Sequence, residues 1–246
     1  LTDAAVFAAP AIFVVLWASG FIGAKYGLPY APPLTFLTVR MGGVVLVMGL
    51  IILATRPALP SRDAVLHSAV TGLFVHGCYL GGVFVAINHG LPAGFAALVV
   101  SLQPILTSTL ASRLLGERVA LQQWLGLVLG VAGVYLVVHG HTGGEAPLFA
   151  WLSATFALIG MTIGTLYQKR FGGGIEWRTG FFCQYVAAAL LFALAVGIAV
   201  WRLGAGRSAP GERVQFGAGM RIHRRPGEPV VAGEALFTLY SDTPER

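Results

Sequence analysis

Long apolar runs, separated by short polar breaks, fill most of the chain. A run of about 20 apolar residues is long enough to cross the hydrocarbon core of a bilayer as a helix. Seven such runs are present. They are roughly Ala4–Ala24, Pro33–Ala54, Ala64–Ile87, Leu91–Ser112, Val119–Val138, Pro147–Gln168 and Thr179–Trp201. We therefore predict an all-α polytopic membrane protein with seven transmembrane helices.

The runs do not fit a large soluble helical bundle. Soluble helices need a polar outer face that recurs with a period of about 3.6 residues, whereas these runs are apolar all round. Composition agrees, because 56% of residues are hydrophobic and only 11% are charged. The first run is followed by others, which argues against a cleaved signal peptide. The net charge of +6 is not arranged as a basic face with interleaved aromatics, so we expect no nucleic-acid partner.

Basic residues gather in alternate breaks between the runs. Seven of them lie in three such breaks, whereas the breaks on the other side contain only Lys25. Short cytoplasmic loops of membrane proteins are enriched in Lys and Arg. The pattern predicts a multi-pass protein of the inner (plasma) membrane with a cytoplasmic N-terminus. The seven residues are Arg56, Arg62, Arg113, Arg118, Lys169, Arg170 and Arg178.

Small residues at four-residue spacing predict close helix packing. Glycines at such a spacing let two helix backbones approach each other in lipid. Together the pairs favour a compact bundle over loosely tethered helices. The pairs are Gly23 and Gly27, Gly77 and Gly81, Gly126 and Gly130, and Gly160 and Gly164.

The sequence also contains a faint internal repeat. Residues 16–25 and 35–41 are echoed by residues 158–169 and 179–185. In both copies a glycine-containing run ends at a basic residue, and the next run begins with Thr and aromatic residues. Five predicted spans separate the copies, so they are inverted in the membrane. Inverted repeats are typical of transporters, with the substrate site near the repeat interface.

Five segments of the chain carry a family resemblance: Trp17–Pro29, Pro32–Arg40, Ala93–Thr107, Leu115–Val119 and Trp124–Leu136. Together they resemble EamA-type transporters of the drug/metabolite transporter superfamily. The resemblance implies two inverted repeats of five helices and export or exchange of small metabolites. This sequence departs from that pattern, because we expect residues 1–140 to form the first repeat and residues 147–201 to form only two helices of the second.

Residues 202–246 differ abruptly in composition. They carry seven Arg and five acidic residues, and residues 227–240 predict a strand, a turn and a second strand. Residues 214–230 and 233–246 resemble the C-terminal domain of thymidine and related pyrimidine-nucleoside phosphorylases. We predict a short, soluble, β-rich tail, which the predicted topology places outside the cell. Our hypothesis is that it is a chimeric fragment, joined by a frame error, an assembly chimera or gene decay.

Arg40, Gln103 and Pro104 are candidates for the substrate pathway. Arg40 lies about 10 Å into its predicted span at 1.5 Å per residue. An ionisable group at such depth marks a functional site, unless the side chain extends to the interface. Gln103 offers both a donor and an acceptor to a substrate, and Pro104 kinks its helix. The alternative for this pair is a helix–helix hydrogen bond at a structural kink.

Trp17, Tyr79 and His76 are further candidates. Trp17 and Tyr79 could stack on a substrate or simply pack in the core. His76 could couple protons or be a packed neutral histidine. In the repeat register Gln184 and Tyr185 correspond to Arg40, so both are candidates as well. These choices stay open at the level of sequence.

The remaining chemistry-bearing residues predict no reaction. Cys78 and Cys183 fall in apolar runs, where cysteine usually behaves as a small buried hydrophobe. His139 and His141 lack the further ligands that a metal site needs. Gly172–Gly174 is not followed by the Lys-Ser/Thr of a phosphate-binding loop. We therefore expect no catalytic residue, no metal ion and no cofactor.

These observations favour a permease for a small metabolite or drug. Its partners would be the lipid bilayer and the small-molecule substrate, and a homodimer fits the hypothesis. Two alternatives remain at this stage. One is an inert membrane fragment, and the other is a membrane-tethered relic of a pyrimidine-nucleoside phosphorylase.

Overall fold

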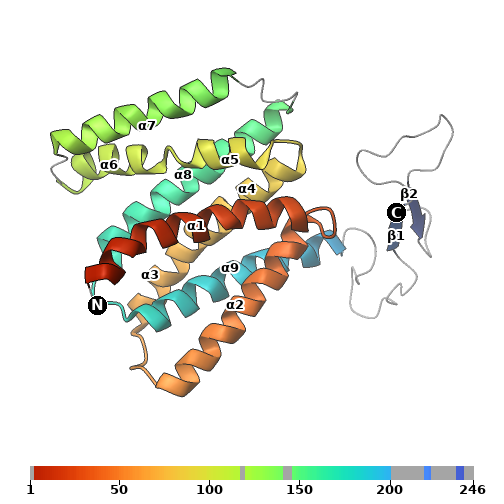
Figure 1. Ribbon diagram of the computed structural model, residues 1–246. Helices are drawn as coiled ribbons and strands as arrows, with labels where there is room; N and C mark the ends of the chain where they lie inside the picture. The colour runs from red at the N-terminus through yellow and green to blue at the C-terminus, as the bar shows by residue number, and fades with distance from the viewer. Residues whose placement is uncertain (1–2, 117–119, 141–145, 201–218, 223–236, 241–246) are drawn as a thin grey trace. The chain divides into compact units, whose positions relative to one another are not determined.

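The computed structural model describes residues 3–116, 120–140, 146–200, 219–222 and 237–240 (Figure 1). The chain divides into two compact units, Leu1–Phe192 and Ala193–Arg246, which are described separately. The helices begin close to the predicted runs. They are α1 (Asp3–Gly27), α2 (Pro33–Thr55), α3 (Arg62–Gly72), the π-helix η1 (Leu73–Cys78), α4 (Tyr79–Asn88), α5 (Ala93–Val100), α6 (Gln103–Leu114), α7 (Leu121–Gly140), α8 (Leu148–Phe171) and α9 (Trp177–Val200).

Five helical segments are long and apolar enough to cross a membrane. The prediction of a multi-pass helical membrane protein is therefore confirmed. α1 and α7 contain shorter apolar stretches, Ala11–Gly27 and Leu121–Gly133, so the count of seven spans stays a prediction. The five segments are Pro33–Thr55, Arg62–Asn88, Ala93–Leu114, Leu148–Phe171 and Trp177–Val200.

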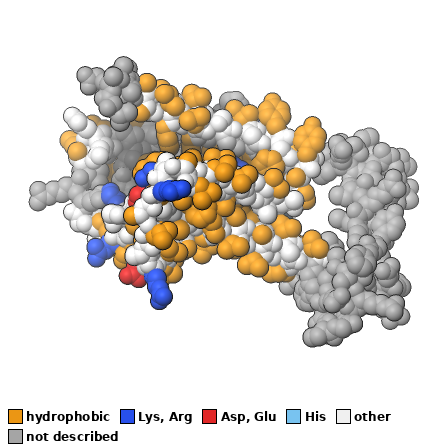
Figure 2. Space-filling view, turned by 90° about the horizontal axis from the view of Figure 1, so that it is seen from below, with side chains coloured by type: hydrophobic (Ala, Val, Ile, Leu, Met, Phe, Trp, Pro, Cys, Tyr) orange, Lys and Arg blue, Asp and Glu red, His pale blue; other side chains and the backbone are white. Residues whose placement is uncertain are grey.

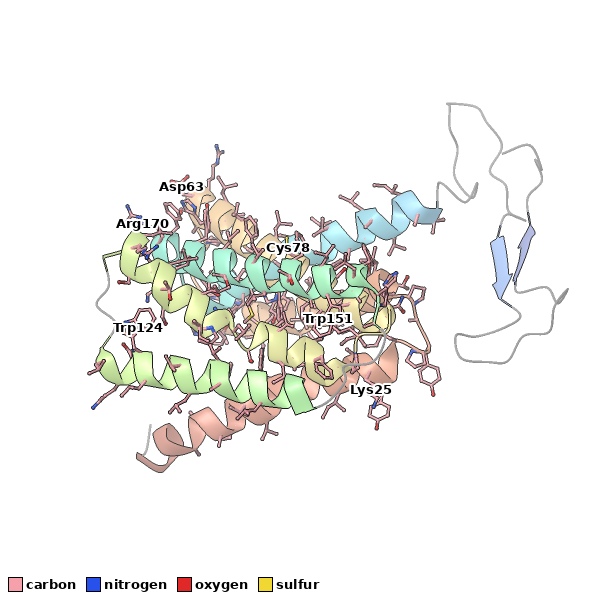
Figure 3. All side chains as sticks on the ribbon, turned by 90° about the horizontal axis from the view of Figure 1, so that it is seen from above. Lys25, Asp63, Cys78, Trp124, Trp151 and Arg170 are labelled. Atoms are coloured by element: carbon pink, nitrogen blue, oxygen red, sulfur yellow. The ribbon has the colours of Figure 1, made fainter. Side chains whose placement is uncertain are left out.

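The surface of the bundle has the character that a lipid environment requires. Hydrophobic side chains cover much of the face in Figure 2, and the charged side chains on that face gather mainly toward one end. Figure 3 shows Asp63 and Arg170 toward one end of the bundle and Lys25 toward the other, with Cys78 between them. Lys25 lies in the last turn of α1 and Arg170 in the last turn of α8. The two helices therefore run in opposite directions, as an inverted repeat requires.

The packing of the first unit centres on α8. This helix contacts α3, η1, α4, α5 and α6. Its inner face is built from small residues, including Ala150, Ala154 and Ala157, which are fully buried. A Cβ atom at Gly160 would lie 2.6 Å from Cys78 Cβ, and one at Gly164 would lie 2.6 Å from Val75 Cγ2. Glycine at these two positions therefore allows the backbones of α8 and η1 to approach closely.

The prediction of close packing holds for some of the other glycine pairs and not for others. A Cβ at Gly77 would lie 2.7 Å from Leu191 of α9, and one at Gly81 would lie 3.4 Å from Phe192. Close packing is therefore confirmed for this pair as well as for the pair in α8. In the first pair Gly27 meets the Phe36 ring, whereas Gly23 has open space. The prediction is wrong for the α7 pair, because no described atom lies within 4 Å of a Cβ at Gly126 or Gly130.

Pro104 interrupts the fourth predicted span. Proline has no backbone N–H and its ring displaces the carbonyl four residues earlier. The helix stops at Val100 and restarts at Gln103, and the Leu102 N–H bonds the Val99 carbonyl at 3.2 Å instead of the carbonyl four residues back. The predicted kink is confirmed.

The π-helix η1 was not predicted from the sequence. It joins α3 to α4 without a break, so Arg62–Asn88 is one continuous helical segment. A π-helical turn is wider than an α-helical turn and often occurs at functional sites. Here it contains His76.

The described part of the tail contains two short antiparallel strands, β1 (Gly219–Ile222) and β2 (Phe237–Tyr240). Gly219 pairs with Tyr240, and Ile222 pairs with Phe237. β2 falls inside the segment predicted to form strand, turn and strand. The first predicted strand and the remainder of the expected β-rich tail lie outside the described residues.

Candidate functional site

A cavity of about 380 Å³ lies among α1, α2, η1, α4, α8 and α9. Most of its lining is apolar, with residues such as Phe21, Val83 and Phe84. Five of the eight predicted pathway residues line it: Trp17, Arg40, His76, Tyr79 and Tyr185. These residues come from α1, α2, η1, α4 and α9, so only the folded bundle brings them together. The volume is within the range of small-molecule sites.

His76 occupies the wall formed by η1. Its ring stacks on Tyr185 of α9, with the ring centroids 4.3 Å apart and an interplanar angle of 18°. The side chain of Gln184 also lies next to it. The His76 Nε2 atom is buried and has no hydrogen-bond partner among the described residues. A buried polar atom without a partner is costly, so it marks a position where a ligand atom or water is favourable.

Two further lining residues, Trp17 and Tyr79, combine aromatic rings with polar tips. Trp17 packs edge-on against Phe21, with centroids 5.2 Å apart. Tyr79 is 7% exposed, and its side chain lies next to that of Trp17. An indole N–H and a phenolic hydroxyl therefore lie close together at an otherwise apolar surface.

Arg40 supplies the charge of the cavity. Its side chain is exposed within the described residues and belongs to the lining. It lies close enough to His76, Tyr79 and Tyr185 to act on each electrostatically. No carboxylate pairs with it in the part of the chain that the structure describes. An unpaired guanidinium within a membrane span is expensive and marks a pathway for polar ligands.

The other three predicted residues lie outside this cavity. Gln103 Nε2 donates to Thr107 Oγ1 at 2.8 Å and to Thr165 Oγ1 of α8 at 3.3 Å. This contact favours the helix–helix alternative, and Pro104 forms the kink beside it. Gln184 is buried and lines a smaller cavity of about 110 Å³. Substrate roles for Gln103, Pro104 and Gln184 stay predictions.

A polar region that the sequence did not reveal lies between the central cavity and the loops. The small cavity is bordered by His67, Ser68 and Thr71 as well as Gln184. His67 and Glu176 also border a third cavity, of about 390 Å³, at the loop end. These two cavities share His67 and Glu176, and Gln184, which borders the small one, lies next to His76. The only signal of this region in the sequence was the spacing of His67, Thr71 and His76 along one run.

Two residues, His67 and Glu176, make the contacts that order the loop end of this region. The His67 ring stacks on Phe171 with centroids 4.8 Å apart, and His67 Nδ1 lies 2.8 Å from the Tyr167 hydroxyl. Glu176 accepts a hydrogen bond from Arg178 Nε at 2.6 Å and one from the Thr179 N–H at 3.0 Å. Desolvation raises the pKa of Glu176, but the hydrogen bonds from Thr179 and Arg178 together outweigh it and hold the pKa below its usual range.

Among the described residues no three His, Cys, Asp or Glu side chains cluster as a metal site. Cys78 and Cys183 are free and half-buried rather than fully buried. His139 lies at the end of α7 without a described side chain, and His141 lies outside the described residues.

Comparison with known proteins separates a transporter-like N-terminal part from a C-terminal part with other relatives. Residues 4–139 match the EamA-like transporter family. The chain is 29% identical over 168 residues to the uncharacterized transporter YvbV of Bacillus subtilis, which covers 68% of this chain and 54% of that protein. It is 28% identical over 160 residues to a probable amino-acid metabolite efflux pump of Escherichia coli, which covers 65% of this chain and 52% of that protein.

The C-terminal part has different relatives. Residues 189–246 match the pyrimidine nucleoside phosphorylase C-terminal domain, a longer match than the resemblance predicted, and one that begins inside α9. Thymidine phosphorylase of Mycobacterium tuberculosis is 78% identical over 54 residues, which are 22% of this chain and 13% of that enzyme.

The chain spans about half the length of the curated transporters that it matches. The family match covers more than half of this chain, and five apolar helices of the described structure are able to cross a membrane. The chain is thus a multi-pass membrane protein that belongs to the EamA-like transporter family.

Proposed function

We propose that the chain forms the substrate path of a small-molecule permease in the inner membrane and is not an enzyme. The observation that carries the proposal is the central cavity. Aromatic walls converge there with the Arg40 guanidinium and the His76 Nε2 atom, neither of which has a partner among the described residues. A site of this kind binds and releases a solute without making or breaking a covalent bond.

Alternating access is the proposed mechanism. The opposed directions of α1 and α8 support a pseudo-symmetric pair, α1–α2 and α8–α9, that encloses the cavity. Rocking of one pair against the other would expose the cavity to each side of the membrane in turn. The polar region around His67 and Gln184 would then be the route to the loop end.

The proposed topology has seven spans and a cytoplasmic N-terminus. Support comes from the basic residues at Arg56, Arg62, Arg170 and Arg178, which flank α2, α3, α8 and α9. In this arrangement residues 1–140 and 147–201 form the membrane part, and the tail at 202–246 lies outside the cell. A fluorescent-protein fusion in the 56–61 loop should fluoresce, whereas one in the 141–146 loop should not. The reverse pattern would contradict the topology.

Flux through proteoliposomes tests the permease proposal. The full-length chain is reconstituted, and a panel of labelled organic acids, amino acids and cationic drugs is assayed for uptake. At least one solute should enter faster than in protein-free vesicles. Gly20 lines the cavity and has open space at its Cβ position, so Gly20→Trp should block the flux without a helix clash.

The matched control is Gly130→Trp on α7, which also has open space but lies outside the cavity. It should leave the flux unchanged. Equal rates with and without protein for the whole panel would overturn the proposal. So would a flux that Gly20→Trp leaves intact.

A further inference from the structure

We propose that the central cavity selects a small organic anion, a carboxylate attached to an aromatic or apolar body, over the corresponding cation or zwitterion. The inference rests on the proposed function, because it treats the cavity as the substrate site. It names the class of solute that the cavity's own residues are built to hold.

The first argument is charge. Arg40 is the only Lys, Arg, Asp or Glu residue that lines the cavity within the described residues. Asp63 and Glu176, the acidic residues whose side chains the structure describes, lie at helix ends or in loops and do not line the cavity. In a region of low dielectric constant an unpaired guanidinium favours an anion strongly and repels a cation.

The second argument is hydrogen bonding. A guanidinium and an indole N–H can donate but cannot accept. Arg40 therefore offers donors only. The Trp17 indole is hydrogen-bonded to the side chain of Tyr79, so the hydroxyls of Tyr79 and Tyr185 are the further groups that can donate. A carboxylate accepts several hydrogen bonds and matches this set, particularly as a bidentate partner of arginine. His76 Nε2, which has no hydrogen-bond partner among the described residues, is a further donor when it carries the proton.

The third argument is the apolar remainder of the wall. Phe21, Leu80, Val83 and Phe84 line the cavity together with the aromatic faces of Trp17 and Tyr79. A ligand that carried only charge would leave this surface uncovered. An aromatic or branched aliphatic body would bury it, and burial of apolar surface is the main source of small-ligand affinity.

The same residues discriminate against free amino acids. An α-ammonium group binds best to a carboxylate, and the described lining contains no carboxylate. The neutral hydroxyls and His76 could accept only by turning away from the carboxylate. An acid that lacks the α-amino group should therefore bind more tightly than the amino acid with the same side chain.

Binding to the full-length chain in lipid nanodiscs tests the inference without requiring transport. Isothermal titration would compare four probes of one shape: 3-phenylpropanoate, its neutral amide, L-phenylalanine and 3-phenylpropylamine. The anion should bind at least tenfold more tightly than the amide, the amino acid more weakly than the anion, and the cation not measurably. Equal affinity for anion and amide, or tighter binding of the amino acid or the cation, would overturn the inference on the unmodified protein alone.

Variants then assign the effect to Arg40. Arg40→Gln should remove at least tenfold of the anion affinity and leave amide binding within twofold. Arg113→Gln, at the end of α6 and outside the cavity, is the control and should change neither. Arg40→Lys keeps the charge without the planar fork and should lose only part of the preference. An anion preference that survives Arg40→Gln would contradict the assignment.

Failure of the inference can be told apart from failure of the permease proposal. Anion-selective binding without flux would uphold the inference and contradict the transport mechanism. Flux of cations or amino acids without anion-selective binding would contradict the inference and uphold the transport mechanism.

Discussion

Two helices of this protein carry the same glycine spacing and use it differently. In α8 Gly160 and Gly164 face η1, and an added Cβ at either position would lie 2.6 Å from a neighbouring side chain. In α7 Gly126 and Gly130 face open space among the described residues. The comparison shows that a small-residue pair becomes a packing motif only where the fold places a second backbone opposite it.

The reason for the difference lies in the position of each helix. α8 contacts five other helical elements, and its alanines are buried against them. In lipid the hydrophobic effect does not drive one helix onto another, so close van der Waals packing has to stabilise the contact. The contact between α8 and η1 therefore depends on Gly160 and Gly164, whereas α7 does not depend on Gly126 and Gly130 for packing.

The largest expected effect comes from filling the glycine contact in α8. Gly164→Val would drive its side chain into Val75 of η1, and overpacking of this kind costs about 1–3 kcal/mol. The reconstituted protein should lose thermal stability, measured by the fraction that stays monodisperse after heating in detergent. Gly130→Val on α7 is the matched control and should have the same thermal stability as the wild type. If the two variants behave alike, the contrast between the helices is wrong.

A smaller effect is expected at the α6–α8 contact. Gln103 donates to Thr165 at 3.3 Å, and hydrogen bonds between membrane helices contribute about 0.6 kcal/mol on average. Gln103→Leu and Thr165→Val should each destabilise slightly, and the double variant should cost less than the sum of the two. Binding in the cavity should not change, because neither residue lines it. Additive losses, or a loss of binding, would instead favour a substrate role for Gln103.

The smallest effect is expected at the loop end of α9. The hydrogen bonds to Glu176 lower its pKa in the folded protein, so they stabilise the fold above the usual pKa of Glu. That contribution is lost as the pH falls through the lowered value. The melting temperature of the wild type should therefore drop more between pH 7 and strongly acidic pH than that of Glu176→Gln. Parallel pH profiles for the two proteins would contradict this account.

The parts of the fold that could be predicted from sequence depend on local composition. Bilayer thickness fixes the length of an apolar run, so the bounds of α2, α8 and α9 fall within a few residues of the predicted ones. Pro104 likewise acts on its own helix, and its kink was predictable. η1 was not, because a π-helical turn depends on the neighbouring helices that hold Leu73–Cys78 in place.

The site was predictable in part for the same reason. Arg40 is conspicuous in any apolar run, and Trp17, His76 and Tyr79 are polar or amphipathic side chains within spans. Gln103 looked equivalent to them, but its Thr165 partner lies 62 positions away in sequence and only the fold brings the two together. The polar region around His67 and Gln184 is likewise a product of helix packing, so no local pattern specified it.

The most direct test of the account compares two glycines that differ only in their surroundings. Gly20 lines the central cavity and Gly130 lies on α7, and both have open space at the Cβ position. Each is changed to cysteine in a background with Cys78→Ala and Cys183→Ala, and the rate of reaction with a charged, membrane-impermeant thiol reagent is measured in intact vesicles. The account predicts rapid labelling of Gly20→Cys and little labelling of Gly130→Cys. Equal rates, or faster labelling on α7, would contradict a solute path between α1, α2, η1 and α9.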